Sequence, residues 1–221
     1  MKRLHILYTL LFIWLLPVTS NGQPAGKEKL RVISYNIWNG FEHDASRRAN
    51  FINWIKGQQP DILAMTELVG FTEKDLGQLA SEYGHKYYAI VKEEGYPVGI
   101  TSNEPITVVK KQMEGFWHGM LHVKTHGLDM IVTHLSPHDW KFRLKEAQML
   151  TSYIQDNQLD NCMVMGDFNA YSPFDADWVE THAQLIENMQ KWDAEQETYR
   201  NMRDGRFDYS VLSKFLSIGL T

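Results

Sequence analysis

Short apolar segments that each end in a polar residue recur along the chain. Residues 163–165 are apolar and lead through Gly166 to Asp167 and Asn169, whose spacing lets both side chains leave the same face of an extended strand. Three further segments share the design: residues 30–36 end in Asn36, residues 61–67 in Glu67, and residues 130–134 in His134. The pattern predicts four buried strands that each deliver one residue of a type that binds metal or phosphate.

Helical spacing of apolar residues separates these strands. Residues 44–57 carry Ala49, Ile52 and Ile55 on one stripe, with Asp44 or Ser46 as the cap and Gly57 as the end. The other predicted helices cover residues 71–83, 140–155 and 177–191. Strand and helix alternate, as expected of a domain that contains parallel strands.

The remaining apolar segments predict further strands. They are residues 87–91, 97–101, 106–109, 120–123 and 206–212. Residues 97–101 and 106–109 flank a Ser-Asn-Glu-Pro turn, which indicates an antiparallel pair. Parallel and antiparallel pairing in one chain predicts two packed sheets.

Three histidines, His118, His122 and His126, recur every four residues. On a helix this spacing would suit zinc. Gly119 and Gly127 favour a strand, on which the same spacing lines one polar face. We therefore expect a strand here, with a zinc site as the alternative.

Composition is that of one globular domain, with 221 residues, 43% hydrophobic and 22% charged. The formal net charge is −5, and residues 1–22 carry two basic residues and no acidic one, so their removal would leave −7. Proteins that grip long nucleic acids need many bases. The charge therefore favours a small phosphate-containing substrate over long nucleic acid.

The first 22 residues have the features of a secretory signal peptide. Lys2 and Arg3 precede an apolar run from residue 6 to 16, and small residues such as Ser20 and Gly22 follow. The run is shorter than the roughly 20 residues of a membrane span, so an anchor is the alternative and no stable membrane insertion is expected. We expect a periplasmic or secreted protein, with residues 23–221 as the mature domain. Cys162 is the single cysteine, so no internal disulfide can form.

Five motifs in order resemble the endonuclease/exonuclease/phosphatase superfamily, which includes pancreatic deoxyribonuclease, apurinic endonucleases, bacterial sphingomyelinases and inositol-polyphosphate phosphatases. They are Ser-Tyr-Asn at 34–36, Pro-Asp-Ile-Leu-Ala at 60–64 with Glu67, Thr-His-Leu at 133–135, Gly-Asp-Phe-Asn at 166–169 and Arg-Phe-Asp-Tyr at 206–209. The resemblance implies an α+β fold, a four-layered α/β/β/α sandwich of two mixed sheets with helices outside.

The resemblance also implies roles. Glu67 would bind a divalent cation beside Asn36, and Asp167 would orient or deprotonate the attacking water. Asn169 and His134 would donate to phosphate oxygens, and Asp208 would orient a distant catalytic histidine. Oxygen ligands favour Mg²⁺, Mn²⁺ or Ca²⁺.

Arg143 is a further candidate for substrate binding. It stands with Lys141 and Lys145 on the first turns of the helix predicted over residues 140–155. A positive charge there would attract phosphate, and a solvated helix face is the alternative.

The chain departs from the family pattern at two places. Thr66 replaces the glutamine that precedes the metal-binding Glu, and no Ser-Asp-His segment follows Asp208. The second departure predicts a domain that is incomplete at its C-terminus and lacks its last strand, through truncation or frameshift, through degeneration to a binding protein, or with rescue by His138 or His182.

The expected function is that of an exported, divalent-metal-dependent phosphoesterase. It would act as a monomer on a small phosphodiester or phosphomonoester, with activity impaired by the missing histidine. An extracellular nuclease, with nucleic acid as its partner, and a non-catalytic phosphate-ligand binding protein are the alternatives.

Overall fold

Two four-stranded sheets pack face to face in the computed structural model, which describes residues 29–220. The first sheet has the order β1 (Val32–Asn36), β2 (Ile62–Thr66), β4 (Gly99–Ser102), β3 (Tyr87–Ile90). The second has the order β5 (Thr107–Gln112), β6 (Met120–Thr125), β7 (Leu128–His134), β8 (Cys162–Asp167). Both sheets are mixed, because β1–β2 and β7–β8 are parallel pairs and the other neighbours are antiparallel. The predicted signal peptide lies outside the described residues.

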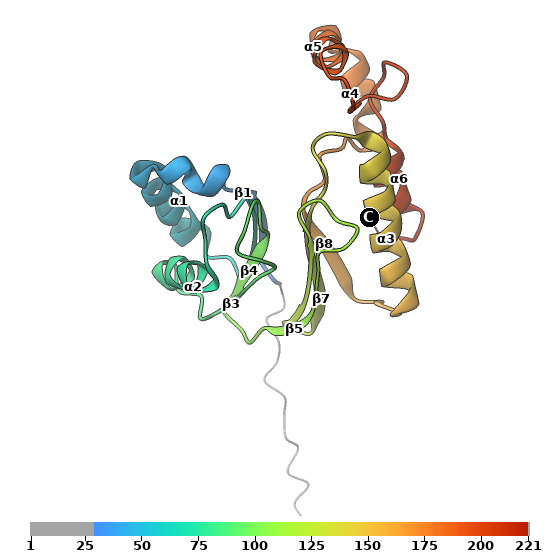
Figure 1. The fold of residues 1–221 in the computed structure, drawn as a ribbon. Helices are drawn as coiled ribbons and strands as arrows, with labels where there is room; N and C mark the ends of the chain where they lie inside the picture. Colours follow the sequence, from blue (N-terminus) through green and yellow to red (C-terminus); the bar gives the residue numbers. More distant parts are fainter. Residues whose placement is uncertain (1–28, 221) are drawn as a thin grey trace, which may run out of the picture.

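Helices cover the outer face of each sheet (Figure 1). On the first sheet lie α1 (Ala45–Gln58) and α2 (Glu73–Glu82), and on the second lie α3 (Trp140–Asp156) and α6 (Ser210–Leu216). The order of layers is therefore helix, sheet, sheet, helix, which confirms the predicted four-layered α+β sandwich. No helix within residues 29–220 is both long and apolar enough to cross a membrane.

Three apolar clusters hold the layers together. Ile52, Ile55 and Leu76 belong to the cluster between the first sheet and its helices, and Ile100 and Val132 to the cluster between the sheets. The third cluster packs α3 and α6 on the second sheet. Burial of these side chains is the main force that fixes the sandwich.

The predicted start of α1 is confirmed and its predicted end is wrong. The Asp44 side chain accepts hydrogen bonds from the backbone N–H groups of Ser46 and Arg47, as predicted for the start of this helix. The helix runs past Gly57, and Gln59 rather than Gly57 takes the left-handed conformation at its end.

Three predictions are wrong: one strand pairing, one continuous helix and one strand. Residues 97–101 and 106–109 do not pair, because β4 and β5 belong to different sheets. The helix predicted over residues 177–191 is two helices, α4 (Ala176–Glu180) and α5 (Ala183–Ala194), separated at His182, whose ψ of 67° is not helical. Residues 206–212 form no strand, because α6 begins at Ser210.

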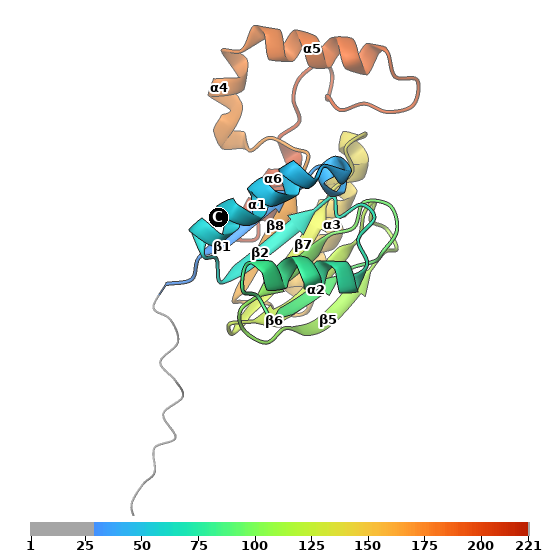
Figure 2. The ribbon, with the colours of Figure 1, turned by 90° about the vertical axis from the view of Figure 1, so that its left-hand side faces the viewer.

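The segment from residue 170 to 209 extends beyond the end of the sandwich. Figure 2 shows α4 and α5 projecting past the ends of the strands. The short 3-10 helix η2 (Pro173–Asp175) precedes them in this segment. Most of this segment is exposed, including Phe174 and Trp178. It borders the rim at which the candidate site lies.

Candidate active site

Parallel pairing brings the predicted polar residues to one rim. Asn36 lies opposite Thr66 in the β1–β2 register, so Glu67 follows directly at the same edge. His134 lies opposite Asp167 in the β7–β8 register. The carboxyl ends of parallel strands lie at the same end of a sheet, and the two sheets face each other, so four side chains from distant segments converge.

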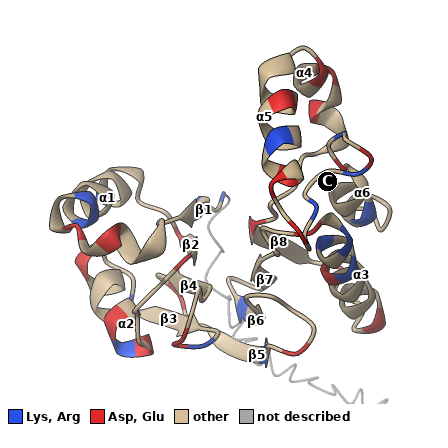
Figure 3. Ribbon diagram, turned by 45° about the horizontal axis from the view of Figure 1, so that its top comes forward, with Lys and Arg blue, Asp and Glu red and all other residues tan. Residues whose placement is uncertain are grey.

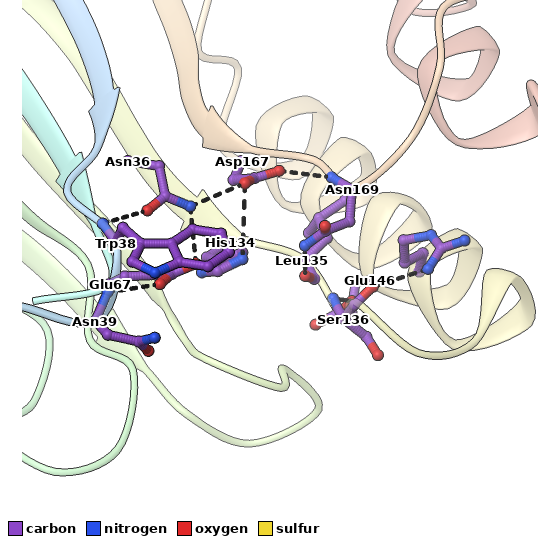
Figure 4. Close-up of polar contacts among 11 residues, drawn as sticks. Asn36, Trp38, Asn39, Glu67, His134, Leu135, Ser136, Glu146, Asp167 and Asn169 are labelled. Atoms are coloured by element: carbon purple, nitrogen blue, oxygen red, sulfur yellow. Dashed lines mark hydrogen bonds and ion pairs between the residues drawn. The ribbon is translucent and has the colours of Figure 1, made fainter. Parts of the chain in front are cut away.

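The amide of Asn36 connects the two sheets at this rim (Figure 4). Its Nδ2 lies 2.9 Å from Glu67 Oε1 and 3.2 Å from Asp167 Oδ2, and donates to both. Its Oδ1 accepts from the backbone N–H of Trp38 at 2.8 Å. Asn36 thus holds the two carboxylates close to each other.

Glu67 also fixes the turn that follows β1. Its Oε2 accepts from the backbone N–H of Asn39 and its backbone oxygen from that of Gly40, each at 2.8 Å. That turn contains the 3-10 helix η1 (Asn39–His43), and residues 38–43 all have positive φ. Only Gly40 in this run is a glycine, and the left-handed region costs other residues about 1–2 kcal/mol each. A Cβ at Gly40 would lie 2.1 Å from the Val69 carbonyl oxygen, so this position needs glycine.

Asp167 and Asn169 form a tight turn after β8. The backbone N–H of Asn169 donates to Asp167 Oδ1 at 2.9 Å, and the Asn169 amide nitrogen donates to the backbone oxygen of Leu135 at 2.9 Å. Gly166, with φ 128°, permits the approach of β8 to β7, because a Cβ there would lie 1.8 Å from the Thr133 carbonyl oxygen. The turn holds the Asp167 carboxylate at the edge of the cavity.

His134 is buried beside Asp167. Its Nε2 lies 4.0 Å from Asp167 Oδ2, and its buried Nδ1 has no hydrogen-bond partner. Burial lowers the pKa of His134, against the smaller opposing pull of Asp167 and Glu67. The imidazole is therefore neutral at pH 7.

His118 stacks on His134, a contact that the sequence did not predict. Burial and the proximity of His134 lower the pKa of His118 to about 3. His122 instead contacts Tyr153 and Asp129, and His126 contacts Asn103. The three regularly spaced histidines therefore do not converge, and the alternative of a zinc site on them is wrong.

A cavity of about 700 Å³ opens at the rim. Asn36, Asp167 and Asn169 line it, and so do Arg143 and Asp208. All seven predicted site residues therefore lie in or beside one region, because Glu67 and His134 contact residues that line it.

The side chains of Arg143 and Asp208 line the cavity but form hydrogen bonds with neighbouring residues of the protein. The Arg143 guanidinium donates to the backbone oxygens of Ser136 and Asn201 and to Asn201 Oδ1, while its buried Nε has no partner. Asp208 Oδ2 accepts from the backbone N–H and hydroxyl of Ser210 at the start of α6. Within residues 29–220, no histidine hydrogen-bonds or forms an ion pair with Asp208.

Glu146 holds two loops beside the site, a role that the sequence motifs did not predict. Its Oε1 and Oε2 accept from the backbone N–H groups of Trp117 and Ser136, each at 2.8 Å. Burial raises the pKa of Glu146 to about 7, although both N–H donors and Arg143 oppose the shift. The available clue was position, because Glu146 and Arg143 fall on the same helix stripe as Ala147 and Leu150.

The donor set fits a hard divalent cation. Neither Glu67 nor Asp167 forms an ion pair with Lys or Arg in the described part of the chain, and the buried Thr66 hydroxyl that lines the cavity has no partner. Within residues 29–220, no three His, Cys, Asp or Glu side chains form a ready metal cage. Mg²⁺ keeps several waters and needs only one or two carboxylates, so this rim suits it better than a metal that requires a full protein cage.

A four-layered sandwich with polar residues gathered at one rim is a fold of phosphoesterases and nucleases. The chain belongs to the Endonuclease/Exonuclease/phosphatase family, whose model matches residues 33–215. No curated protein matches it.

Solved structures share the fold at low sequence identity. An AP endonuclease from Archaeoglobus fulgidus is 19% identical with a TM-score of 0.55, over 86% of this chain and 70% of that one. The 3′ phosphatase NExo from Neisseria, bound to a product DNA hairpin, is 17% identical with a TM-score of 0.59, over 87% and 72%. TDP2 from D. rerio, complexed with a single-strand DNA product, is 18% identical with a TM-score of 0.51, over 68% and 65%. The chain thus spans 65–72% of the length of these solved structures.

Proposed function

We propose that the protein is an exported, divalent-metal-dependent phosphoesterase that hydrolyses a small phosphodiester or phosphomonoester. One observation carries the proposal: the Asn36 amide donates to both Glu67 and Asp167, with the neutral His134 beside Asp167. Family membership supports hydrolysis of phosphoric esters as the reaction class.

The residues divide the work by their chemistry. Glu67 would hold the cation together with the Oδ1 atom of Asn36, which also accepts from the Trp38 N–H. When bound, the cation supplies positive charge to neutralise the developing charge on the phosphate. Asp167, fixed by the Asn169 N–H, would orient and deprotonate the attacking water. His134 and Asn169 would donate hydrogen bonds to phosphate oxygens, which they can do without carrying charge.

Size and charge favour a small substrate. The cavity of about 700 Å³ suits a small molecule. Figure 3 shows Lys and Arg interspersed with Asp and Glu over the helices, with α4 and α5 bearing several acidic residues. A long nucleic acid would need a basic track to neutralise its phosphates.

The direct test is hydrolysis of bis(p-nitrophenyl) phosphate and p-nitrophenyl phosphate by protein freed of metal with a chelator. We expect activity to return with Mg²⁺ or Mn²⁺ and to fall about 10²-fold or more in Glu67→Gln and Asp167→Asn. Glu195→Gln, an exposed acid on the projecting segment, is the matched control. Activity that is unchanged by the chelator would contradict the proposal. Metal-dependent phosphate binding without formation of product would favour a binding protein.

Export rests on residues 1–22 alone. Mass spectrometry of the protein from fractionated cells of the source organism tests it. We expect a chain that starts near residue 23 in the periplasmic or secreted fraction. A chain that starts at Met1 and remains in the cytoplasm would contradict export and leave the hydrolase proposal intact.

A further inference from the structure

Trp38 stands out among the exposed aromatic residues because the site itself holds it in place. It follows β1 and begins the run of six residues with positive φ from 38 to 43. Its backbone N–H donates to the Asn36 side chain, and the next backbone N–H, of Asn39, donates to Glu67. The two residues that would hold the cation therefore also hold the backbone that carries the indole.

This backbone is strained and well supported. Phe41, inside the left-handed turn, is buried against Phe51, and Glu42 pairs with Arg47. Backbone strain persists only where the surroundings enforce it, and it concentrates at functional sites. The turn therefore fixes where Trp38 lies relative to Asn36 and Glu67.

The indole is anchored at one edge and left open elsewhere. Its Nε1 donates to Glu42 Oε1 at 3.0 Å, while 54% of the residue is exposed. In the view of Figure 4 the ring overlaps Glu67 and His134, next to Asn36, whose side chain accepts from the Trp38 backbone N–H. A large apolar ring fixed in an exposed position next to a polar site is available to a ligand.

We propose that Trp38 determines specificity by stacking on a nucleobase, so that the preferred substrates are phosphoesters of nucleosides. The inference rests on the proposed function, because it places the scissile phosphate at the Asn36–Glu67–Asp167 rim. The Nε1–H is already bound to Glu42, so the ring offers its π face rather than a donor. That favours a flat conjugated partner, and a nucleobase is separated from its phosphate by a single sugar.

Stacking on one ring also agrees with the charge of the protein. Stacking of a nucleobase on an aromatic side chain contributes to binding without any requirement for Lys or Arg side chains that neutralise phosphates. The net charge of −5 leaves little attraction for a long strand. A single platform beside an acidic site therefore fits one nucleoside unit.

The test compares two diesters with the same leaving group, thymidine 5′-(p-nitrophenyl phosphate) and methyl p-nitrophenyl phosphate. We expect Trp38→Ala to lower kcat/KM for the thymidine ester by about 5- to 150-fold, mainly through KM, and to leave the methyl ester nearly unchanged. Trp38→Phe should restore most of the loss. Trp178→Ala is the matched control, because Trp178 is 52% exposed but lies on α4.

Equal losses on both esters, or no loss on either, would overturn the stacking role. A second readout, calorimetric titration with thymidine 5′-monophosphate and with inorganic phosphate, separates this proposal from the hydrolase proposal. If no variant turns over substrate but Trp38→Ala weakens only thymidine monophosphate binding, stacking stands and hydrolysis fails. If the wild type hydrolyses both esters and Trp38→Ala binds both ligands as the wild type does, hydrolysis stands and stacking fails.

Discussion

His118 and His134 stack with their ring centroids 4.4 Å apart and their planes inclined by 29°. Both rings are buried, and burial is the largest cause that lowers the pKa of each. Two adjacent imidazolium ions would repel each other in this environment. The folded protein therefore keeps the pair neutral, which leaves His134 a neutral hydrogen-bond donor at the rim.

This stack makes stability depend on pH. The unfolded His118 has a pKa of about 6.5, and the folded one has a pKa of about 3. Between these values the unfolded chain binds a proton that the folded chain does not, so stability is lost as the pH falls below 6.5. In His118→Phe, which keeps a ring and removes the proton site, we expect the fall in unfolding free energy between pH 7 and pH 5 to shrink by about 2 kcal/mol.

Urea unfolding at the two pH values measures this difference. His182→Phe is the control, because it removes an exposed histidine from the segment before α5. The explanation fails if His118→Phe loses as much stability between pH 7 and pH 5 as the wild type does.

Glu146 should be needed as a carboxylate. Both of its oxygens accept buried or partly buried backbone N–H groups, from Trp117 and Ser136. In Glu146→Gln one of these N–H groups would face an amide NH₂, so we expect a loss of about 1–3 kcal/mol in unfolding free energy at pH 8. Chemical denaturation of this variant and of Glu195→Gln measures the loss, and equal stability of the two variants would contradict the role of Glu146 in holding the two loops.

Gly166 should tolerate no side chain. A Cβ would lie 1.8 Å from the Thr133 carbonyl oxygen, a backbone atom that cannot move without displacing β7. Gly127 also has positive φ, at 74°, but a Cβ there meets nothing within 4 Å. We expect Gly127→Ala to lose about 1–2 kcal/mol and Gly166→Ala to lose more than about 3 kcal/mol or fail to fold. Thermal unfolding compares them, and similar losses would show that β8 does not pack as described.

The strand-end residues were predictable because the pattern that marks them is local and recurs along the chain. Apolar segments that end at Asn36, Glu67, His134 and Asp167 identify strands, and parallel neighbours must deliver their ends to one edge. The four-layered fold was expected from the family resemblance that the five ordered motifs carry.

Other features depend on tertiary contacts that the sequence does not display. Residues 206–212 looked like a strand, yet Val211 and Phe215, four residues apart, pack the helix α6 beside α3. The left-handed turn at 38–43 contains one glycine and exists because Glu67 and buried Phe41 enforce it. The stack of His118 on His134 joins the segment before β6 to the end of β7. The sequence did not predict this contact, because the regular spacing of His118, His122 and His126 suggested that those three belong together.

In the proposed site, Glu67 and Asn36 at the first sheet hold one cation beside the Asp167 carboxylate of the second sheet, and Mn²⁺ binding followed by electron paramagnetic resonance tests this most directly. We expect chelator-treated protein to bind one Mn²⁺ at the rim and Mg²⁺ to compete for it. Glu67→Gln and Asp167→Asn should each weaken binding, while Glu195→Gln should not. Mn²⁺ binding that is unchanged in both rim variants would contradict the account.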